Sequence, residues 1–235
     1  MPDQDVRLQH LKVWLDEQLA IVYATQGWGE VPPATLTAAS SDASFRRYFR
    51  WQGAGRSFVV MDAPPPQENC KPFVDIARLL ATCGINVPKI YAEDLPRGFL
   101  LLNDLGNQTY LDVINEHNAD ALFEDAFQAL LAFQQLPMDT PLPSYDVALL
   151  RRELELFPEW YIGRELGISL SPQQREQWQR ASDLLIDSAL AQPKVLVHRD
   201  YMPRNLMHSE PNPGVLDFQD AVYGPVTYDV TCLFK

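Results

Sequence analysis

The spacing of apolar residues changes near residue 107, and this change limits the folds that the chain can adopt. Before it, apolar or alternating runs predict β-strands at residues 35–39, 45–51, 56–63, 89–91 and 98–102. After it, apolar residues recur at helical spacing and predict helices over residues 119–135, 146–166 and 172–191. A strand-rich half followed by a helix-rich half predicts an α+β protein with two lobes.

Two helices complete the strand-rich half. An apolar stripe over residues 3–24 predicts a docked surface helix, and a second stripe over residues 72–82 predicts a helix between the third and fourth strands. We therefore expect a five-stranded, mainly antiparallel sheet with one inserted helix.

Composition excludes several classes of function. The formal net charge of −12 would repel phosphate backbones, so we expect no nucleic-acid partner. Cys70, Cys83 and Cys232 are odd in number and lack a CxxC pair, which predicts reduced thiols and no zinc site. No stretch has the length of a membrane span, and the acidic N-terminus does not resemble a secretory signal. We expect a cytoplasmic protein without membrane contact, and nothing in the sequence indicates an obligate protein partner.

The segment LVHRDYMPRNLM, residues 196–207, places polar side chains directly after an apolar run. Pro203 rules out a regular helix across the following residues, so Asp200 and Asn205 are expected on one short loop. A second acid, Asp217, ends another short apolar run in GVLDFQDA. One acid and the amide could bind magnesium while the other acid orients a hydroxyl. This arrangement predicts phosphoryl transfer.

Each of these residues alone has a simpler interpretation. A single loop aspartate or asparagine is more often a turn residue or a helix cap than a catalytic group. The joint pattern, HxDxxxxN followed by an apolar-LDF segment, is much more specific than its parts and favours a kinase.

The two loops resemble those of the protein-kinase-like fold. HRDYMPRN is similar to the HRDxxxxN catalytic signature, and VLDFQD is similar to the DFG metal-binding signature, with Gln219 in place of the glycine. GPVTYDV resembles the segment after the metal aspartate in aminoglycoside phosphotransferases and choline kinases. Together with DASFRRYFR, MDAPP and ELFPEWY, these motifs resemble bacterial anomeric kinases that phosphorylate N-acetylmuramate and N-acetylglucosamine at C1. The resemblance covers essentially the whole chain.

This resemblance implies an ATP- and magnesium-dependent kinase of peptidoglycan recycling, with a small amino sugar as its substrate. Asp200 would accept or orient the proton of the sugar hydroxyl, while Asn205 and Asp217 would hold magnesium on the ATP phosphates. His198 would brace the loop, and Asp229 would steady it by hydrogen bonding.

The resemblance also implies how the two lobes divide and where the nucleotide lies. The expected units are a nucleotide-binding lobe, a hinge and a catalytic lobe over residues 1–102, 103–106 and 107–235. Backbone groups near Asp104 and Leu105 would meet adenine. SSDAS, residues 40–44, would cover the phosphates with Ser44 at the nucleotide, although this loop lacks a GxGxxG signature.

One position departs from the family pattern. The third strand of related kinases carries a lysine that pairs with the nucleotide phosphates, but Met61 stands there in this chain. A thioether cannot supply the charge. Arg46, Arg47 or Arg50 on the neighbouring strand could approach the phosphates instead, and solvent-facing arginines are an equally consistent interpretation.

Two other functions stay open at this point. An aminoglycoside or other small-alcohol phosphotransferase would share both loops. A catalytically inactive, nucleotide-binding module would fit the missing lysine, but retention of Asp200, Asn205 and Asp217 argues against it.

Weaker signals concern the helical half. Phe157, Trp160 and Tyr161 lie at helical spacing, which is more typical of a core than of a sugar-stacking surface. Arg204 could contact substrate or phosphate, although a salt bridge within the loop is the more common alternative. The final segment TYDVTCLFK begins a helix without a C-terminal cap, so we expect the chain to be part of a longer protein.

Overall fold

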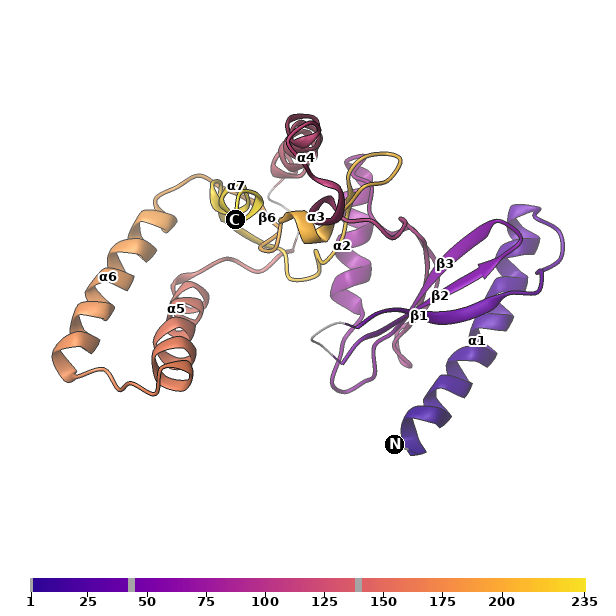
Figure 1. The fold of residues 1–235 in the computed structure, drawn as a ribbon, viewed down its shortest axis with the longest axis horizontal. Helices are drawn as coiled ribbons and strands as arrows, with labels where there is room; N and C mark the ends of the chain where they lie inside the picture. The colour runs from indigo at the N-terminus through magenta and orange to yellow at the C-terminus, as the bar shows by residue number, and fades with distance from the viewer. Residues whose placement is uncertain (1, 42–44, 138–140) are drawn as a thin grey trace.

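The computed structural model describes residues 2–41, 45–137 and 141–235, which form a strand-rich half and a helical half (Figure 1). The strand-rich half contains α1 (Pro2–Gln26), β1 (Thr35–Ser41), β2 (Arg47–Gly53), β3 (Arg56–Asp62), α2 (Lys71–Thr82), β4 (Ile90–Asp94) and β5 (Phe99–Asn103). The α+β class and the protein-kinase-like arrangement predicted from the sequence are confirmed.

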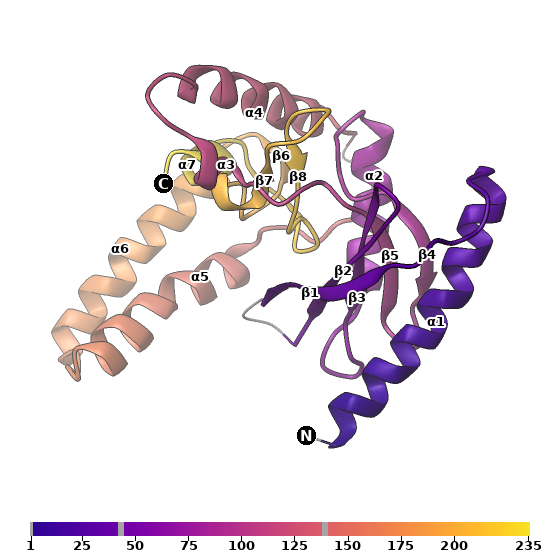
Figure 2. The same ribbon diagram turned by 45° about the vertical axis from the view of Figure 1, so that its right-hand side comes forward.

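The sheet of the strand-rich half has the order β1-β2-β3-β5-β4, and all neighbouring strands are antiparallel. Alternation along β3 directs Phe58 and Val60 into a core shared with α1, while Met61 packs into the core that contains α2. The two helices therefore cover opposite faces, and Figure 2 shows α1 lying along one of them.

A buried carboxylate fastens α1 to the sheet. Asp62 at the end of β3 is fully buried and accepts a 2.7 Å hydrogen bond from Nε of Arg7 on α1. It also pairs with Arg47 on β2. Because both oxygens of Asp62 have cationic partners, its burial is compensated.

The helical half follows the sheet. Its elements are α3 (Tyr110–Val113), α4 (Ala119–Gln134), α5 (Val147–Leu156), a π-helix η1 (Phe157–Glu165), α6 (Pro172–Leu190), β6 (Lys194–Val197), a 3₁₀ turn η2 (Pro203–Asn205), β7 (Leu206–Met207), β8 (Gly214–Val215), β9 (Val222–Pro225) and α7 (Tyr228–Leu233). In both views α5 and α6 lie side by side and extend away from the sheet. Ser171 and Gln174 form a capping box at the start of α6.

Two expectations for the helical half are wrong. The single helix expected over residues 146–166 changes to a π-helix at Phe157, next to Pro158, which has no N–H for the regular helical pattern. The aromatic side chains expected in a core are about half exposed, at 47% for Phe157 and 51% for both Trp160 and Tyr161. They lie at the outer end of the α5–α6 pair, where the described residues offer little to cover them.

Two further features concern the cysteines and the length of the helices. All three cysteines are free thiols. Among the helices formed by the described residues, none combines the length and apolar character needed to cross a membrane.

Candidate active site

A cavity of about 480 Å³ lies between the sheet and the loops after β6 and β8. This volume is in the usual range for small-molecule sites. Its lining combines residues of β2, β3, the predicted hinge and both predicted catalytic loops, among them Tyr48, Arg50, Val59, Asn103, Asp104, Leu105, Arg204, Asn205, Asp217 and Gln219. Four of the residues predicted at the nucleotide or metal, Asp104, Leu105, Asn205 and Asp217, therefore border one space.

A two-stranded hairpin brings two of these residues together. Asn205 directly precedes β7, and Asp217 lies two residues after β8, its antiparallel partner. The backbone N–H of Leu216 donates to the carbonyl oxygen of Asn205 at 2.9 Å, which continues the pairing. The segment between Asn205 and Asp217 therefore forms a hairpin, which brings the two residues close together.

His198 connects the two loops. It is 1% exposed, and its Nε2 lies 2.9 Å from the carbonyl oxygen of Leu216. The backbone N–H of Asp200 donates to Nδ1 at 3.3 Å. These contacts require a neutral ring with its proton on Nε2, and burial accordingly lowers the pKa of His198 to about 4. A single imidazole therefore bridges the segments that carry both acids.

Asp229 stabilises the start of the loop at His198 and Arg199. Its carboxylate accepts hydrogen bonds from the backbone N–H groups of His198 at 2.7 Å and Arg199 at 3.0 Å. Burial raises the pKa of Asp229 to about 7, whereas the two backbone donors oppose that rise. The contacts match the loop-steadying arrangement inferred from the resemblance.

Asp200 is partly buried beside the cavity and is not among its lining residues. Burial, followed by the nearby charge of Asp217, raises the pKa of Asp200, so the two acids influence each other electrostatically. Asp217 has a left-handed backbone, with φ of +61°, and its Oδ1 accepts a 2.7 Å hydrogen bond from Gln219. Gln219, which replaces the family glycine, thus occupies one oxygen of Asp217.

The donor set near the hairpin suits magnesium. The Nδ2 group of Asn205 donates to the carbonyl oxygen of Asp200 at 2.8 Å, which leaves its Oδ1 as the atom available to a cation. Together with the carboxylate of Asp217, this supplies the oxygen ligands that Mg²⁺ prefers. Within the described part of the chain, no three His, Cys, Asp or Glu side chains gather as a metal cage. Two protein ligands suffice for a magnesium ion that also binds phosphate oxygens and water.

The predicted hinge is held by Arg50. Its guanidinium donates to both oxygens of Asp104, at 2.7 and 3.1 Å, and to the carbonyl oxygen of Gly106 at 2.7 Å. Asp104 also pairs with Ser57. The side chain of Asp104 is therefore directed at β2 and β3, and both Asp104 and Leu105 line the cavity.

The position of the missing lysine is occupied by a core residue. Met61 is 1% exposed and lies two residues beyond Val59, a cavity-lining residue on the same face of β3. Nothing in the side chain of Met61 can bind phosphate.

None of the three candidate arginines is an isolated, solvent-facing side chain. Arg46 pairs with Glu68 at 3.0 Å, with only 15% and 11% of the two side chains exposed. Arg47 and Arg50 bind Asp62 and Asp104, as described above. Arg46 lies one residue before β2, whose residues Tyr48 and Arg50 line the cavity.

Ser44 and most of the proposed phosphate-covering loop lie outside the described residues. Sequence reasoning did not find Gln219 as a partner of Asp217, nor Glu153, which pairs with Arg199 in the catalytic loop. Gln219 departs from the residue that the DFG-like signature has at its position, and Glu153 lies outside the quoted motifs. Arg204 lines the cavity and is exposed, and among the residues described it makes no ion pair.

A model of the phosphotransferase enzyme family matches residues 35–235. The chain belongs to this family. An N-acetylmuramate/N-acetylglucosamine kinase of Pseudomonas putida is 75% identical over 235 residues, which is all of this chain and 69% of that protein. A protein of the same name from Pseudomonas aeruginosa is 65% identical over 231 residues, covering 98% of this chain and 68% of its own length.

The fold of this phosphotransferase also matches solved structures. The aminoglycoside phosphotransferase APH(2'')-Ib with ADP bound has a TM-score of 0.62 at 17% sequence identity, with 91% of this chain and 74% of that chain covered. At this identity the likeness concerns the fold alone. It agrees with the arrangement of an antiparallel sheet, an inserted helix and a helical half.

Proposed function

We propose that this phosphotransferase transfers the γ-phosphoryl group of ATP to the anomeric C1 hydroxyl of N-acetylmuramate or N-acetylglucosamine, as a step of peptidoglycan recycling. The amino sugars come from the names of relatives with 75% and 65% identity. The observation that carries the reaction type is the meeting of the hinge, Asn205 and Asp217 at one cavity, with Asp200 beside it. Positioning and charge neutralisation account for most of the catalysis of phosphoryl transfer.

Each residue has one role in this proposal. Asp200 orients the attacking hydroxyl and accepts its proton, and its raised pKa brings it closer to the range of an effective base. Asn205 and Asp217 hold magnesium, which would neutralise charge on the ATP phosphates. The backbone near Asp104 and Leu105 receives adenine.

We also propose which residues of the strand-rich half contact the nucleotide. Arg46, which lies one residue before β2 and pairs with Glu68, supplies the positive charge that Met61 cannot supply. Ser44 contacts the nucleotide from the covering loop. We place the hinge at residues 103–106, between lobes at 1–102 and 107–235.

The experiment is an acceptor panel followed by two substitutions. The chain is incubated with ATP, magnesium and N-acetylmuramate, N-acetylglucosamine, an aminoglycoside or choline, and the phosphorylated position is located by NMR. Phosphate at C1 of an amino sugar supports the proposal. Phosphate on an aminoglycoside ring or on choline would replace the proposed acceptor, and nucleotide binding without any product would favour an inactive module.

The substitutions test the proposed roles in catalysis. Asp200→Ala should lower kcat by about 10² to 10⁴ with little change in ATP affinity, because general base catalysis is lost while the nucleotide site stays intact. Asp217→Ala should instead weaken magnesium-dependent ATP binding. Asp75→Ala is the control, since this acid is exposed on α2 and its ion-pair partner among the described residues is Lys71 alone. Unchanged turnover in Asp200→Ala would remove that residue as the base.

Neither rival function has a specific observation in its favour. The aminoglycoside phosphotransferase shares only 17% of its sequence with this chain, whereas the amino sugar kinases share 65–75%. Asn205 and Asp217 both border the cavity, as an active site requires.

A further inference from the structure

Arg199, the residue before the proposed base, has an unusual backbone. Its φ is +80°, in the left-handed region that side chains other than glycine rarely adopt. Such a conformation persists only where the surrounding structure fixes it, and it occurs often at functional sites. Arg199 therefore needs contacts that hold it.

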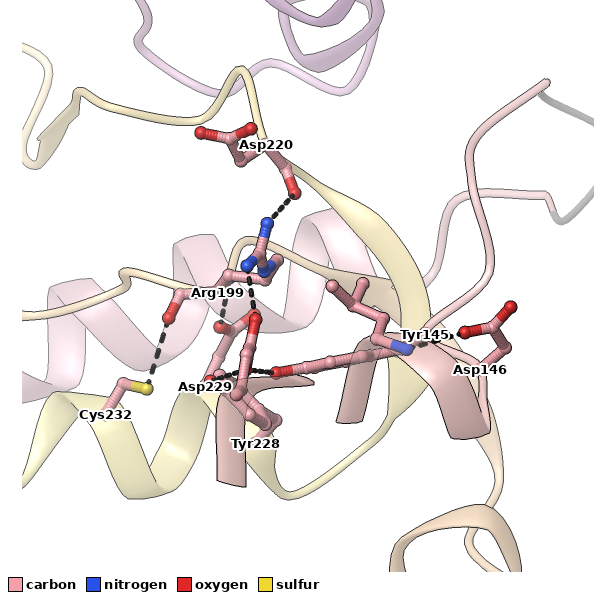
Figure 3. A network of polar contacts seen from close by, with 9 residues as sticks. Tyr145, Asp146, Arg199, Asp220, Tyr228, Asp229 and Cys232 are labelled. Atoms are coloured by element: carbon pink, nitrogen blue, oxygen red, sulfur yellow. Dashed lines mark hydrogen bonds and ion pairs between the residues drawn. The ribbon is translucent and has the colours of Figure 1, made fainter. Parts of the chain in front are cut away.

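The backbone N–H and carbonyl oxygen of Arg199 and both terminal nitrogens of its guanidinium have partners on other segments, while its buried Nε has none among the described residues (Figure 3). Its backbone N–H donates to Asp229 at 3.0 Å, and its carbonyl oxygen accepts a hydrogen bond from Sγ of Cys232 at 3.4 Å. Its guanidinium reaches the carbonyl oxygen of Asp220 at 3.4 Å. These contacts fix the backbone of Arg199 and one end of its side chain.

The remaining partner is a carboxylate from a distant helix. Glu153 lies on α5 and forms an ion pair with the guanidinium of Arg199, with 25% and 20% of the two side chains exposed. Bidentate or charge-assisted contacts with a guanidinium are strong and directional, especially where water is partly excluded. Helix α5 is thereby fastened to the catalytic loop.

Glu153 is itself held in place by two tyrosines. The hydroxyl of Tyr145, a fully buried residue, donates to its carboxylate, and the hydroxyl of Tyr228 lies 3.5 Å from the same oxygen. The guanidinium of Arg199 lies over the Tyr145 ring, 5.8 Å from its centroid. Glu153 is thus a fixed group and not a surface side chain that meets Arg199 by chance.

We propose that Glu153 is a positioning residue for phosphoryl transfer, acting through Arg199 on the direction in which Asp200 points. Asp200 follows Arg199 directly, so a change in the Arg199 backbone turns the Asp200 side chain away from the acceptor. This inference rests on the proposed function, because it takes Asp200 as the group that orients the acceptor hydroxyl. Nucleotide binding depends in this proposal on Asn205, Asp217 and the hinge. Within the described part of the chain, the pair makes no hydrogen bond with any of these, and its contact with the segment after Asp217 is the 3.4 Å hydrogen bond to Asp220.

The first test is the removal of the charge on Glu153. Glu153→Gln keeps the shape of the side chain but loses the ion pair, and it should lower kcat by about tenfold to a hundredfold while KM for ATP changes less than about threefold. Glu155→Gln is the matched control. Glu155 lies on the same helix and also pairs with an arginine, Arg175 at 2.9 Å, but makes no contact with the catalytic loop. Equal losses in both variants would overturn the proposal.

A double variant tests whether Glu153 acts through Arg199. Arg199→Met should lower kcat at least as much as Glu153→Gln, and the double variant should be no slower than the slower single variant. Losses that multiply would show that the two residues act independently and would refute the proposal.

A conservative change separates positioning from folding. Arg199→Lys keeps a cation beside Glu153 and should retain more turnover than Arg199→Met, with both variants showing the same ATP affinity. If circular dichroism shows that Glu153→Gln does not fold, the comparison of Arg199→Lys with Arg199→Met tests the proposal instead. Equal kcat in the lysine and methionine variants would contradict the role of the ion pair.

The proposed function can fail separately from this inference. An unsubstituted chain that phosphorylates no amino sugar would contradict the proposed acceptor. The kcat of each variant relative to the unsubstituted chain would then be measured with the acceptor that the panel identifies. Slow ATP hydrolysis, in which Asp200 orients water, is the alternative reaction. A loss in Glu153→Gln but not in Glu155→Gln would still support positioning, and no loss would still overturn it.

Discussion

Lowering the pH from 7 to 5 should destabilise this phosphotransferase through His198. The ring is buried and neutral, with its proton on Nε2 and the Asp200 N–H directed at Nδ1. A second proton would have to sit on Nδ1, where it would face another donor. Burial accordingly lowers the pKa of His198 from an ordinary 6.5 to about 4.

The sign follows from proton linkage. When the pKa of a group is lower in the folded chain than in the unfolded chain, the unfolded chain binds the proton first as the pH falls. Stability from His198 is therefore complete above about pH 7 and is lost as the pH falls through 6.5 toward 4. A tenfold difference in proton affinity is worth about 1.4 kcal/mol, so full titration costs roughly 3 kcal/mol and the step from pH 7 to pH 5 costs about 2 kcal/mol.

Asp229 contributes in the opposite direction. Burial raises the pKa of Asp229 to about 7, so its protonation as the pH falls stabilises the folded chain. The total pH dependence of the protein therefore does not isolate His198. A comparison with His198→Gln does, because glutamine keeps an N–H for the carbonyl oxygen of Leu216 but cannot titrate, while Asp229 is the same in both proteins.

The assay is urea unfolding at pH 7 and pH 5, followed by circular dichroism. Between these conditions the unsubstituted chain should lose about 2 kcal/mol more unfolding free energy than His198→Gln. Equal losses in both proteins would refute the reasoning and would mean that His198 is protonated as easily in the folded chain as in the unfolded chain.

Two further substitutions test contacts around the sheet. Arg50→Ala should weaken ATP binding by about tenfold, because a charge-assisted contact that holds the Asp104 backbone at the hinge is lost. Calorimetric titration measures the ATP affinity. An equal loss of affinity in Arg56→Ala, a change away from the cavity, would contradict this reasoning. Asp62→Asn should lower the unfolding free energy by about 3 kcal/mol, because two arginines lose their buried counter-charge. Urea unfolding measures that loss, with Asp94→Asn as the control, because Asp94 also pairs with an arginine but its side chain is less buried than that of Asp62. A change below that of the control would show that Asp62 is not needed for stability.

Local signals in the sequence determined the elements and the principal site residues. Strand alternation and helical spacing depend on neighbours within a few positions, and β1 to β5, α2, α4 and α6 lie close to their predicted bounds. Asn205 and Asp217 could be found because each lies next to a short apolar run, and Asp200 because it shares a recognisable loop with Asn205. Asn205 and Asp217 are brought together by a local hairpin, the pairing of β7 with β8.

Only the tertiary structure decided which charges meet. Arg199 and Glu153 are 46 positions apart, and Arg50 and Asp104 are 54 apart, so no periodicity or motif relates them. The tautomer of His198 could not be predicted from the sequence either, because it depends on the carbonyl group of Leu216, 18 positions away. Ion pairs and ring protonation are set by burial and by partners brought from distant segments, and these exist only once the sheet and helices have packed.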